Sequence, residues 1–558
     1  MKTKLVLYAF AAIGILMVTS ASAQSYAIRN AKIVTVSGAT IENGTVVVRD
    51  GLIEAVGANL QVPSDAQVFD GAGLTVYPGF IDALTNLGLA APAARPAGTP
   101  GGGGGGPNAA AAAAAAAASQ ESNSNYPAGL RPEERIIDEI RAGEAQFETS
   151  RNAGFTTALS TGRTGIFNGQ SALINLAGDS VSRMTLRSPV AMHVSFVTIP
   201  GRYPASLLGT FSALRQMLND ARRHDELLKM YNANPKGLRR PEADRSIEAL
   251  IPVVNGQIPV IFNANRENEI VRALDLAKEY NLKAIIAGGQ EAWKFADRLK
   301  AQNVPVLLSL NFPKRTAAAS PDADPDSLET LRFRAETPKG PGKLAAAGVK
   351  FAFQDGGVTN IADYFSNAQK AVEGGLSRDA AIRAMTLSPA EIFGVADRTG
   401  SIETGKIANL TVVRGDLFGR DRVVTHVFVD GKLFEPKPPA APQGGRGQRP
   451  GGGENPSALP NVAGGYAVTI QAPGQTLTGT LTLIQQGGQL TGTLVTQLGT
   501  SQLKDGRVTN AGISFGGSVV FGGQTVDFTV QATITGNQLN GTIDTPQGGI
   551  PITGTRIP

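Results

Sequence analysis

The chain has 558 residues, 42% of them apolar, which is too many for one hydrophobic core and predicts two or three domains. Its 51 basic and 46 acidic residues give a formal net charge of +5, which is too small to indicate a nucleic-acid partner. The sequence contains no cysteine, and this excludes disulfides, thiolate metal sites and a lipid anchor on cysteine.

Residues 1–23 have the pattern of a secretory signal peptide. Lys2 and Lys4 precede an apolar run from Leu5 to Val18, and Ala21-Ser22-Ala23 form a small-residue cleavage site. The run is about 14 residues long, whereas a membrane span needs about 20, so a retained anchor is the less favoured alternative. We therefore expect a periplasmic or secreted protein with no transmembrane segment after cleavage.

Two segments far apart in the sequence share a strand-turn-strand pattern. In residues 24–76, alternating strands surround an Asp50-Gly51 turn, and in residues 405–435 similar strands surround Asp430-Gly431. An Asp-Gly pair between apolar strands is a strong hairpin signal. We predict that the two segments together form one composite β-sandwich.

Between these segments, residues 77–404 alternate short apolar strands with helices. The expected strands are 155–160, 190–196, 258–265, 283–289, 304–310 and 350–355, and the expected helices include 131–152, 205–231, 269–280 and 291–301. This alternation predicts an α/β fold, a (β/α)8 TIM-like barrel. A doubly wound sheet is the alternative, but no Gly-x-Gly-x-x-Gly follows the first strand.

Three further segments differ in composition. Residues 90–129 contain glycine and alanine runs and predict a flexible insertion, either filler or a gate over the barrel rim. Residues 436–460 predict a flexible linker. Residues 461–558 repeat Leu-Thr-Gly-Thr-Leu between glycine-containing turns, which predicts a C-terminal antiparallel β domain, a lipocalin- or avidin-like barrel or meander. We expect this domain to be a structural accessory domain, and a module that binds a ligand or the cell envelope is the alternative.

The stretch from Tyr77 to Gly88 resembles a family motif. Pro78-Gly79-Phe80-Ile81-Asp82 matches, without a gap, the Pro-Gly-Phe-Ile-Asp-x-His-x-His sequence that opens the barrel of the amidohydrolase superfamily, the metal-dependent, imidazolonepropionase-like hydrolases. Residues 367–406 resemble the closing helices and turn of that family, although its usual acid is Asn409 here. The resemblance covers about residues 26–435 and implies the barrel and the composite β-sandwich.

The resemblance also implies a catalytic metal. Most of the side chains that would bind this metal in the family are absent from this sequence. The two motif histidines fall on Leu84 and Asn86, and neither an isobutyl group nor a neutral amide is a good zinc ligand. Of the three histidines, His224 is expected at the surface and His426 in the β-sandwich. Only His193 has a position that could face the barrel interior, and a core residue on an apolar strand is the alternative. We therefore predict no metal ligands and no cofactor, with zinc as the alternative.

Asp355 matches the last-strand aspartate, which is a metal ligand and proton shuttle in the family. Without metal, Asp355 remains a candidate general base if burial raises its pKa. The alternative is that Asp355 caps the loop after the strand through backbone N–H groups, as Asp before Gly commonly does. The candidate substrate-binding residues are Asp82, Asn86, His193, Asn263, Asn265 and Arg266.

Two functions follow from these residues. The first is an exported, non-catalytic amidohydrolase-family protein with a degenerate metal site, which binds a small molecule or a peptide or persists as a scaffold. The second is a divergent hydrolase of carbon-nitrogen bonds that uses Asp355 and at most one weakly bound metal. The sequence leaves enzymatic activity and oligomeric state open.

Overall fold

The computed structural model describes residues 25–436 and 461–557, apart from 91–123, 125, 144, 200, 316–325, 359, 473–474, 487–488, 510–511, 522–523 and 546–547. The chain divides into two compact units, Met1–Ala441 and Pro442–Pro558. The predicted signal peptide and nearly all of the predicted insertion and linker lie outside the described residues. Among the described helices, none is long and apolar enough to cross a membrane.

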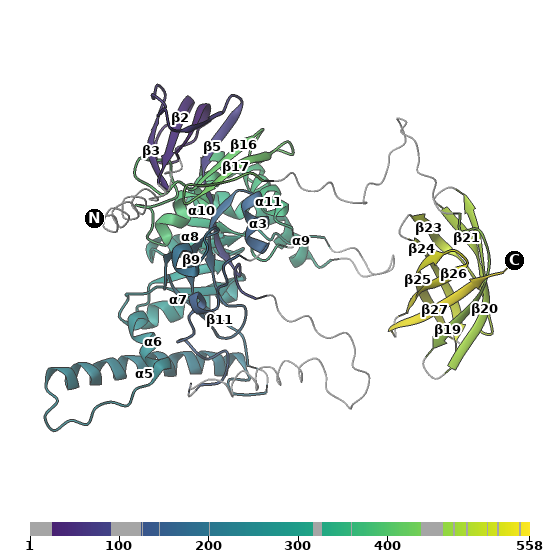
Figure 1. Ribbon diagram of the computed structural model, residues 1–558. Coiled ribbons are helices and arrows are strands. Elements are labelled where there is room, and N and C mark those ends of the chain that lie inside the picture. Colours follow the sequence, from purple (N-terminus) through teal and green to yellow (C-terminus); the bar gives the residue numbers. More distant parts are fainter. Residues whose placement is uncertain are drawn as a thin grey trace, which may run out of the picture. The chain divides into compact units, whose positions relative to one another are not determined.

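In the first unit, an eight-stranded sheet combines strands from both ends of the unit (Figure 1). Its spatial order is β18-β17-β16-β5-β1-β2-β3, with β4 beside β1. The strands are β1 (Tyr26–Ile33), β2 (Ile41–Arg49), β3 (Leu52–Gly57), β4 (Gln67–Asp70), β5 (Leu74–Pro78), β16 (Leu410–Arg414), β17 (Val423–Val429) and β18 (Lys432–Phe434). Antiparallel pairing of β16 with β5 joins the two ends of the unit.

The two Asp-Gly pairs sit at hairpin turns of this sheet. Asp50 and Gly51 have φ values of 52° and 82°, and Asp430 and Gly431 have 52° and 73°. Positive φ at both central residues is the geometry of a type I′ turn, which suits the right-handed twist of the flanking strands. The turns that the sequence predicts therefore direct β2 to β3 and β17 to β18.

Two further sheets lie in the middle of the unit and account for its mixed α/β fold. One is four-stranded, in the order β10-β9-β7-β6, and the other is six-stranded, in the order β15-β14-β13-β12-β11-β8. The strands are β6 (Phe80–Thr85), β7 (Phe155–Ser160), β8 (Phe167–Gln170), β9 (Ala172–Asn175), β10 (Thr185–Arg187), β11 (Met192–Ser195), β12 (Val260–Ala264), β13 (Ala284–Gly288), β14 (Val306–Ser309) and β15 (Phe351–Gln354).

Parallel pairing runs from β11 to β15 and between β6 and β7, as strand-helix repeats predict. Antiparallel pairing of β8 with β11 and of β9 with β7 and β10 departs from a purely parallel sheet. The sequence did not reveal the short strands β8, β9 and β10, because β8 and β10 lack an apolar run and that of β9 is short.

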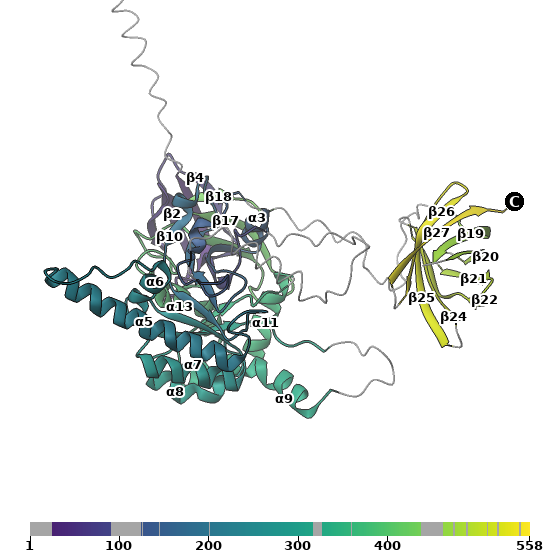
Figure 2. The same cartoon turned by 90° about the horizontal axis from the view of Figure 1, so that it is seen from below.

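Helices cover these sheets (Figures 1 and 2). They are α3 (Ala145–Asn152), α4 (Val181–Met184), α5 (Leu207–Ala233), α6 (Arg245–Val254), α7 (Glu267–Tyr280), α8 (Ala296–Ala301), α9 (Leu328–Glu336), α10 (Gly340–Ala346), α11 (Ala362–Glu373), α12 (Arg378–Met385) and α13 (Leu387–Ile392), with the 3-10 turns η1 (Ile136–Asp138), η2 (Ala292–Phe295) and η3 (Thr337–Lys339). The helix predicted over 131–152 is reduced to η1 and α3, because Gly143 adopts a φ of 80° that no helix accommodates.

The second unit is an antiparallel sheet of nine strands around its own core. The strands are β19 (Gly464–Ala472), β20 (Gln475–Gln486), β21 (Gln489–Thr496), β22 (Gly499–Gln502), β23 (Lys504–Thr509), β24 (Gly512–Phe521), β25 (Gln524–Thr535), β26 (Gln538–Thr545) and β27 (Gly548–Arg556). Because β20 pairs with both β19 and β21, the sheet closes on itself. Leu481 and Leu494 of the repeated motif are buried inside.

We expect residues 461–558 to fold on their own, because this core is built from that segment alone. Phe515 is one of the largest buried side chains in the unit. The Phe515→Ala variant of the isolated segment should lose roughly 3–5 kcal/mol of unfolding free energy. Urea unfolding followed by circular dichroism measures this loss, and Ile484→Ala at an exposed position is the control. A segment without a cooperative transition would contradict the prediction.

Candidate functional site

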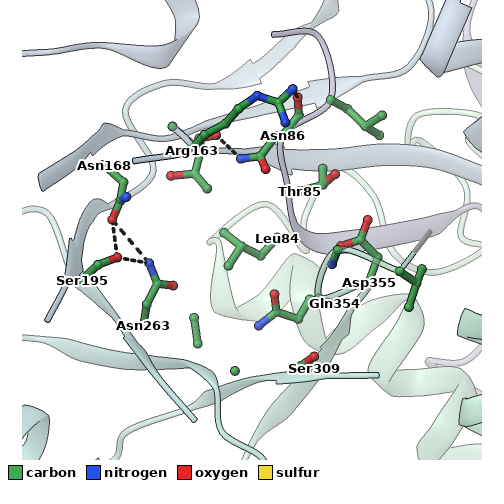
Figure 3. A pocket seen from close by; sticks show the side chains of 18 of the residues that line it. Leu84, Thr85, Asn86, Arg163, Asn168, Ser195, Asn263, Ser309, Gln354 and Asp355 are labelled. Atoms are coloured by element: carbon green, nitrogen blue, oxygen red, sulfur yellow. Dashed lines mark hydrogen bonds between the residues drawn. The ribbon is translucent and has the colours of Figure 1, made fainter. Parts of the chain in front are cut away.

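A pocket of about 590 Å³ lies where the central strands end (Figure 3). Its walls come from the strands β6, β8 and β11 to β15 and from the residues that follow β6, β7, β12 and β15, with Gln146 of α3. Most of its side chains are neutral and polar; its lining is Leu84, Thr85, Asn86, Leu87, Gln146, Thr161, Gly162, Arg163, Asn168, Ser195, Asn263, Asn265, Ala287, Gly288, Ser309, Gln354, Asp355, Gly356, Gly357 and Val358. A concave site with convergent polar groups is the usual form of a small-molecule site.

Leu84 and Asn86, which occupy the histidine positions of the motif, both line the pocket. Leu84 is the next-to-last residue of the strand β6 and Asn86 directly follows it, so both lie at the carboxyl end of that strand. Asn86 Nδ2 donates to the carbonyl oxygen of Thr161 at 2.6 Å. This contact ties the end of β6 to the end of β7.

Three side chains on one wall form a hydrogen-bonded network. Ser195 Oγ donates to Asn168 Oδ1 at 2.6 Å, and Asn263 Nδ2 donates to Ser195 Oγ at 2.7 Å. The parallel pairing of β11 with β12 sets Ser195 opposite Asn263, so the register of the sheet builds this contact. Sequence analysis identified Asn263 but missed Asn168 and Ser195.

The opposite wall is formed by the ends of β14 and β15. Gln354 Nε2 donates to the carbonyl oxygen of Leu307 at 2.7 Å, and Ser309 Oγ accepts from Asn311 N at 3.1 Å. A Cβ on Gly356 would lie 2.0 Å from Ser309 Oγ, and Gly356 has a φ of 64°. Glycine is therefore required at this position for the loop after Asp355 to pass the wall.

Asp82 and Asp355 form a pair of carboxyl groups beside this wall. Asp355 N donates to Asp82 Oδ1 at 3.1 Å, Leu84 N donates to the same oxygen at 3.3 Å, and Gly357 N donates to Asp355 Oδ1 at 2.7 Å. Asp82 is buried, whereas Asp355 reaches the pocket. The last contact also shows that Asp355 caps the Gly356-Gly357 turn, which was one of its two predicted roles.

Burial and proximity alter the proton affinity of this pair. Burial, and then the charge of Asp355, raise the pKa of Asp82 well above its ordinary value. Burial also raises the pKa of Asp355, whereas hydrogen bonds from Gly357, Asp82 and Thr85 oppose the rise. We infer that Asp82 holds a proton which it donates to Asp355. Burial and the two carboxyl groups raise the pKa of Tyr364 well above its ordinary value.

The other predicted site residues lie at different depths. Asn265 lines the pocket, but Arg266 lies outside its lining and stacks on the Phe333 ring, with its Cζ 3.6 Å from the ring centroid. His193 is fully buried two residues before Ser195, and neither of its ring nitrogens has a hydrogen-bond partner among the described residues. Burial lowers the pKa of His193 to about 3, so this imidazole is neutral.

The remaining histidines lie away from the pocket lining. His224, predicted at the surface, is only 13% exposed, and its Nε2 lies 3.5 Å from Glu248 Oε1 because α6 packs against α5. His426 lies on β17 and packs against the Phe69 ring. Within the described part of the chain, no three His, Cys, Asp or Glu side chains gather as a metal-binding group would require.

Thr161 is a pocket residue that sequence analysis also missed. Its side chain is buried and lines the pocket, and its Oγ1 has no hydrogen-bond partner among the described residues. A buried hydroxyl normally has a partner, so its place in a pocket points to a ligand or to water there. The signal in the sequence was a run of polar residues directly after an apolar strand, from Ser160 to Arg163.

The fold and the pocket together define a mixed α/β protein with a polar site at its strand ends. The sequence model of the amidohydrolase family matches residues 341–434. The structure is similar to that of an amidohydrolase from Thermotoga maritima MSB8, with a TM-score of 0.59 and 24% identity, over 74% of this chain and 100% of that chain. It is also similar to a putative prolidase from Bifidobacterium longum, with a TM-score of 0.41 and 19% identity, over 75% of this chain and 96% of that chain.

No curated protein matches the sequence. The family match at residues 341–434 and the shared fold confirm the resemblance to the amidohydrolase superfamily that the Pro78–Asp82 motif predicts.

Proposed function

We propose that this chain is an exported ligand-binding protein of the amidohydrolase superfamily, with a pocket that has lost its metal site and its hydrolytic chemistry. The observation that carries the proposal is the lining of the pocket, in which neutral amides and hydroxyls stand around Leu84 and Asn86. The leader at residues 1–23 supports a periplasmic or secreted location.

We further propose that the two central sheets form one closed (β/α)8 barrel with the pocket at its mouth. The contact from Asp355 N to Asp82 Oδ1 supports closure, because it joins the end of β15 to β6. Hydrogen bonds between Ser171 and the Val190-Ala191 pair support the connection from β8 and β9 to the chain before β11. A mouth built by strand ends is the usual site of function in such barrels.

The residues present do not fit the zinc ion that the family implies. Leu84 has no lone pair, and the neutral amide of Asn86, whose nitrogen donates to Thr161 O, is a poor ligand for zinc. Among the described residues, the acid beside Asp355 is Asp82, and His193 is buried outside the pocket lining. Zinc in proteins takes three or four nitrogen, sulfur or carboxylate ligands.

Metal analysis of the purified protein tests this proposal. We expect substoichiometric zinc by mass spectrometry, no thermal stabilisation by added zinc, and no hydrolysis of a panel of N-acyl amino acids and dipeptides. Zinc bound at one ion per chain, lost together with hydrolysis in the Asp355→Ala variant, would overturn the proposal. The His224 side chain faces α6, away from the pocket lining. Loss of zinc in a His224→Ala variant would therefore indicate that zinc binds outside the pocket.

The carboxyl pair favours a second candidate function, a divergent hydrolase of carbon-nitrogen bonds. Asp355 reaches the pocket with a raised pKa, which suits a general base that activates water. The same hydrolysis panel separates the two functions. Turnover that persists after chelation and disappears in Asp355→Asn would favour the hydrolase.

A further inference from the structure

Four amide side chains of the pocket share one orientation. They donate their NH2 groups to the protein: Asn86 to Thr161 O at 2.6 Å, Gln146 to Leu89 O at 3.1 Å, Asn263 to Ser195 Oγ at 2.7 Å and Gln354 to Leu307 O at 2.7 Å. Three of these acceptors are backbone carbonyl oxygens, which accept hydrogen bonds and cannot donate them. Those three contacts therefore require the nitrogen, and not the oxygen, of each amide.

The orientation of Asn263 is determined by a chain of hydrogen bonds. Asn168 Nδ2 donates to Gly165 O at 3.4 Å, so Asn168 Oδ1 is an acceptor. The Ser195 hydroxyl donates to that oxygen at 2.6 Å and has used its only hydrogen, so it accepts from Asn263. Asn263 must therefore present its nitrogen to Ser195 and its Oδ1 to the pocket, as Figure 3 shows.

This arrangement leaves a hydrogen-bond acceptor on each of the two facing walls. Among the described residues, no group donates to Asn263 Oδ1 or Gln354 Oε1, and both side chains line the pocket. The charged side chains in the lining are Asp355, next to Gln354, and the exposed Arg163. Arg163 lies 3.5 Å from Asn86 O through its Nη2, on another part of the lining.

We propose that the pocket binds its ligand through a primary ammonium group, with Asn263 Oδ1 and Gln354 Oε1 accepting its N–H hydrogens and Asp355 supplying the opposite charge. The inference rests on the ligand-binding function proposed above and assigns the class of ligand, a small organic amine. An ammonium has three donors and no acceptor, so it complements these oxygens. A neutral polyol carries no charge for Asp355 to pair with, and Ca²⁺ would need six to eight oxygens.

A matched pair of probes tests the inference without any variant. Isothermal titration of the full chain, after removal of divalent metals, compares 4-aminobutan-1-ol with butane-1,4-diol, which differ only in the ammonium. We expect the amine to bind at least about 10-fold more tightly, since hydrogen bonds to charged groups are stronger than neutral ones. An amine that binds no better than the diol, whether both bind or neither does, would overturn the inference.

Variants then locate the site. Asn263→Leu and Gln354→Leu should each weaken amine binding about 10-fold, whereas Gln216→Leu, on the exposed face of α5, should not change it. Thermal unfolding of each variant shows whether it is folded. Equal amine affinity in folded Asn263→Leu and Gln354→Leu proteins would overturn the assignment, as would Ca²⁺ binding in the pocket without amine binding.

The two proposals fail in different ways. Tight binding of the diol together with absent zinc would leave the ligand-binding function standing and remove the ammonium assignment. Stoichiometric zinc with hydrolysis would remove the ligand-binding function, whatever the amine does.

Discussion

The Asp82→Asn variant is expected to be more stable than the native protein at pH 8, and the difference should grow from pH 4 upward. Asp82 is buried and its pKa is raised by burial and by Asp355. The folded state therefore binds a proton more tightly than the unfolded chain, whose aspartates have a pKa near 3.9. The stability due to this proton is fully present below about pH 3.9 and is lost as the pH rises through the folded-state pKa.

Asparagine at position 82 removes this pH dependence of the unfolding free energy and can keep the hydrogen bonds of Asp82. Its Oδ1 can still accept from Leu84 N and Asp355 N, and its NH2 can donate to the Asp355 carboxylate. We expect a gain on the order of 1–3 kcal/mol at pH 8, the scale on which a poorly compensated buried polar group destabilises a protein. Urea unfolding at a series of pH values measures the gain, with the exposed Asp179→Asn as control. A variant less stable than the native protein at pH 8 would refute the shared-proton interpretation.

Zinc binding is expected to appear in the double variant Leu84→His/Asn86→His. Both positions line the pocket together with Asp355, so the substitution assembles two imidazoles and a carboxylate at the ends of β6 and β15. Three such ligands with water in the fourth position are the usual set of a catalytic zinc site. Loss of even an outer-shell partner typically changes metal affinity 10–100-fold, so two new ligands should raise it by more than about 100-fold.

Competition with a fluorescent chelator measures the zinc affinity of this variant. The control is Leu84→Gln/Asn86→Gln, which makes the same positions polar without imidazole, and adding Asp355→Ala to the histidine variant should abolish the gain. Hydrolysis need not return, because Asn263 and Asn265 remain amides. Equal zinc affinity in the histidine and glutamine variants would show that residues 84 and 86 do not converge on Asp355.

Local signals in the sequence were sufficient for much of the fold. The Asp-Gly pairs form their turns because short-range φ preferences decide them, and the apolar runs become β11 to β15 because burial on both faces requires such runs. The predicted helix over 205–231 is α5. Where the pattern was weaker, as in 131–152, one glycine with positive φ outweighed helix propensity.

For the site, the sequence by itself determined that Asp82 and Asp355 follow family positions and that the two motif histidines are replaced by Leu84 and Asn86. Only the tertiary structure decided what these residues do. Asp82 and Asp355 are 273 positions apart, and their contact, like the amide chain from Asn168 to Asn263, depends on partners that strand pairing brings together. Burial makes His193 neutral and leaves the Thr161 hydroxyl without a hydrogen-bond partner among the described residues. It is a property of the packed strands, because it depends on neighbours that no local pattern specifies.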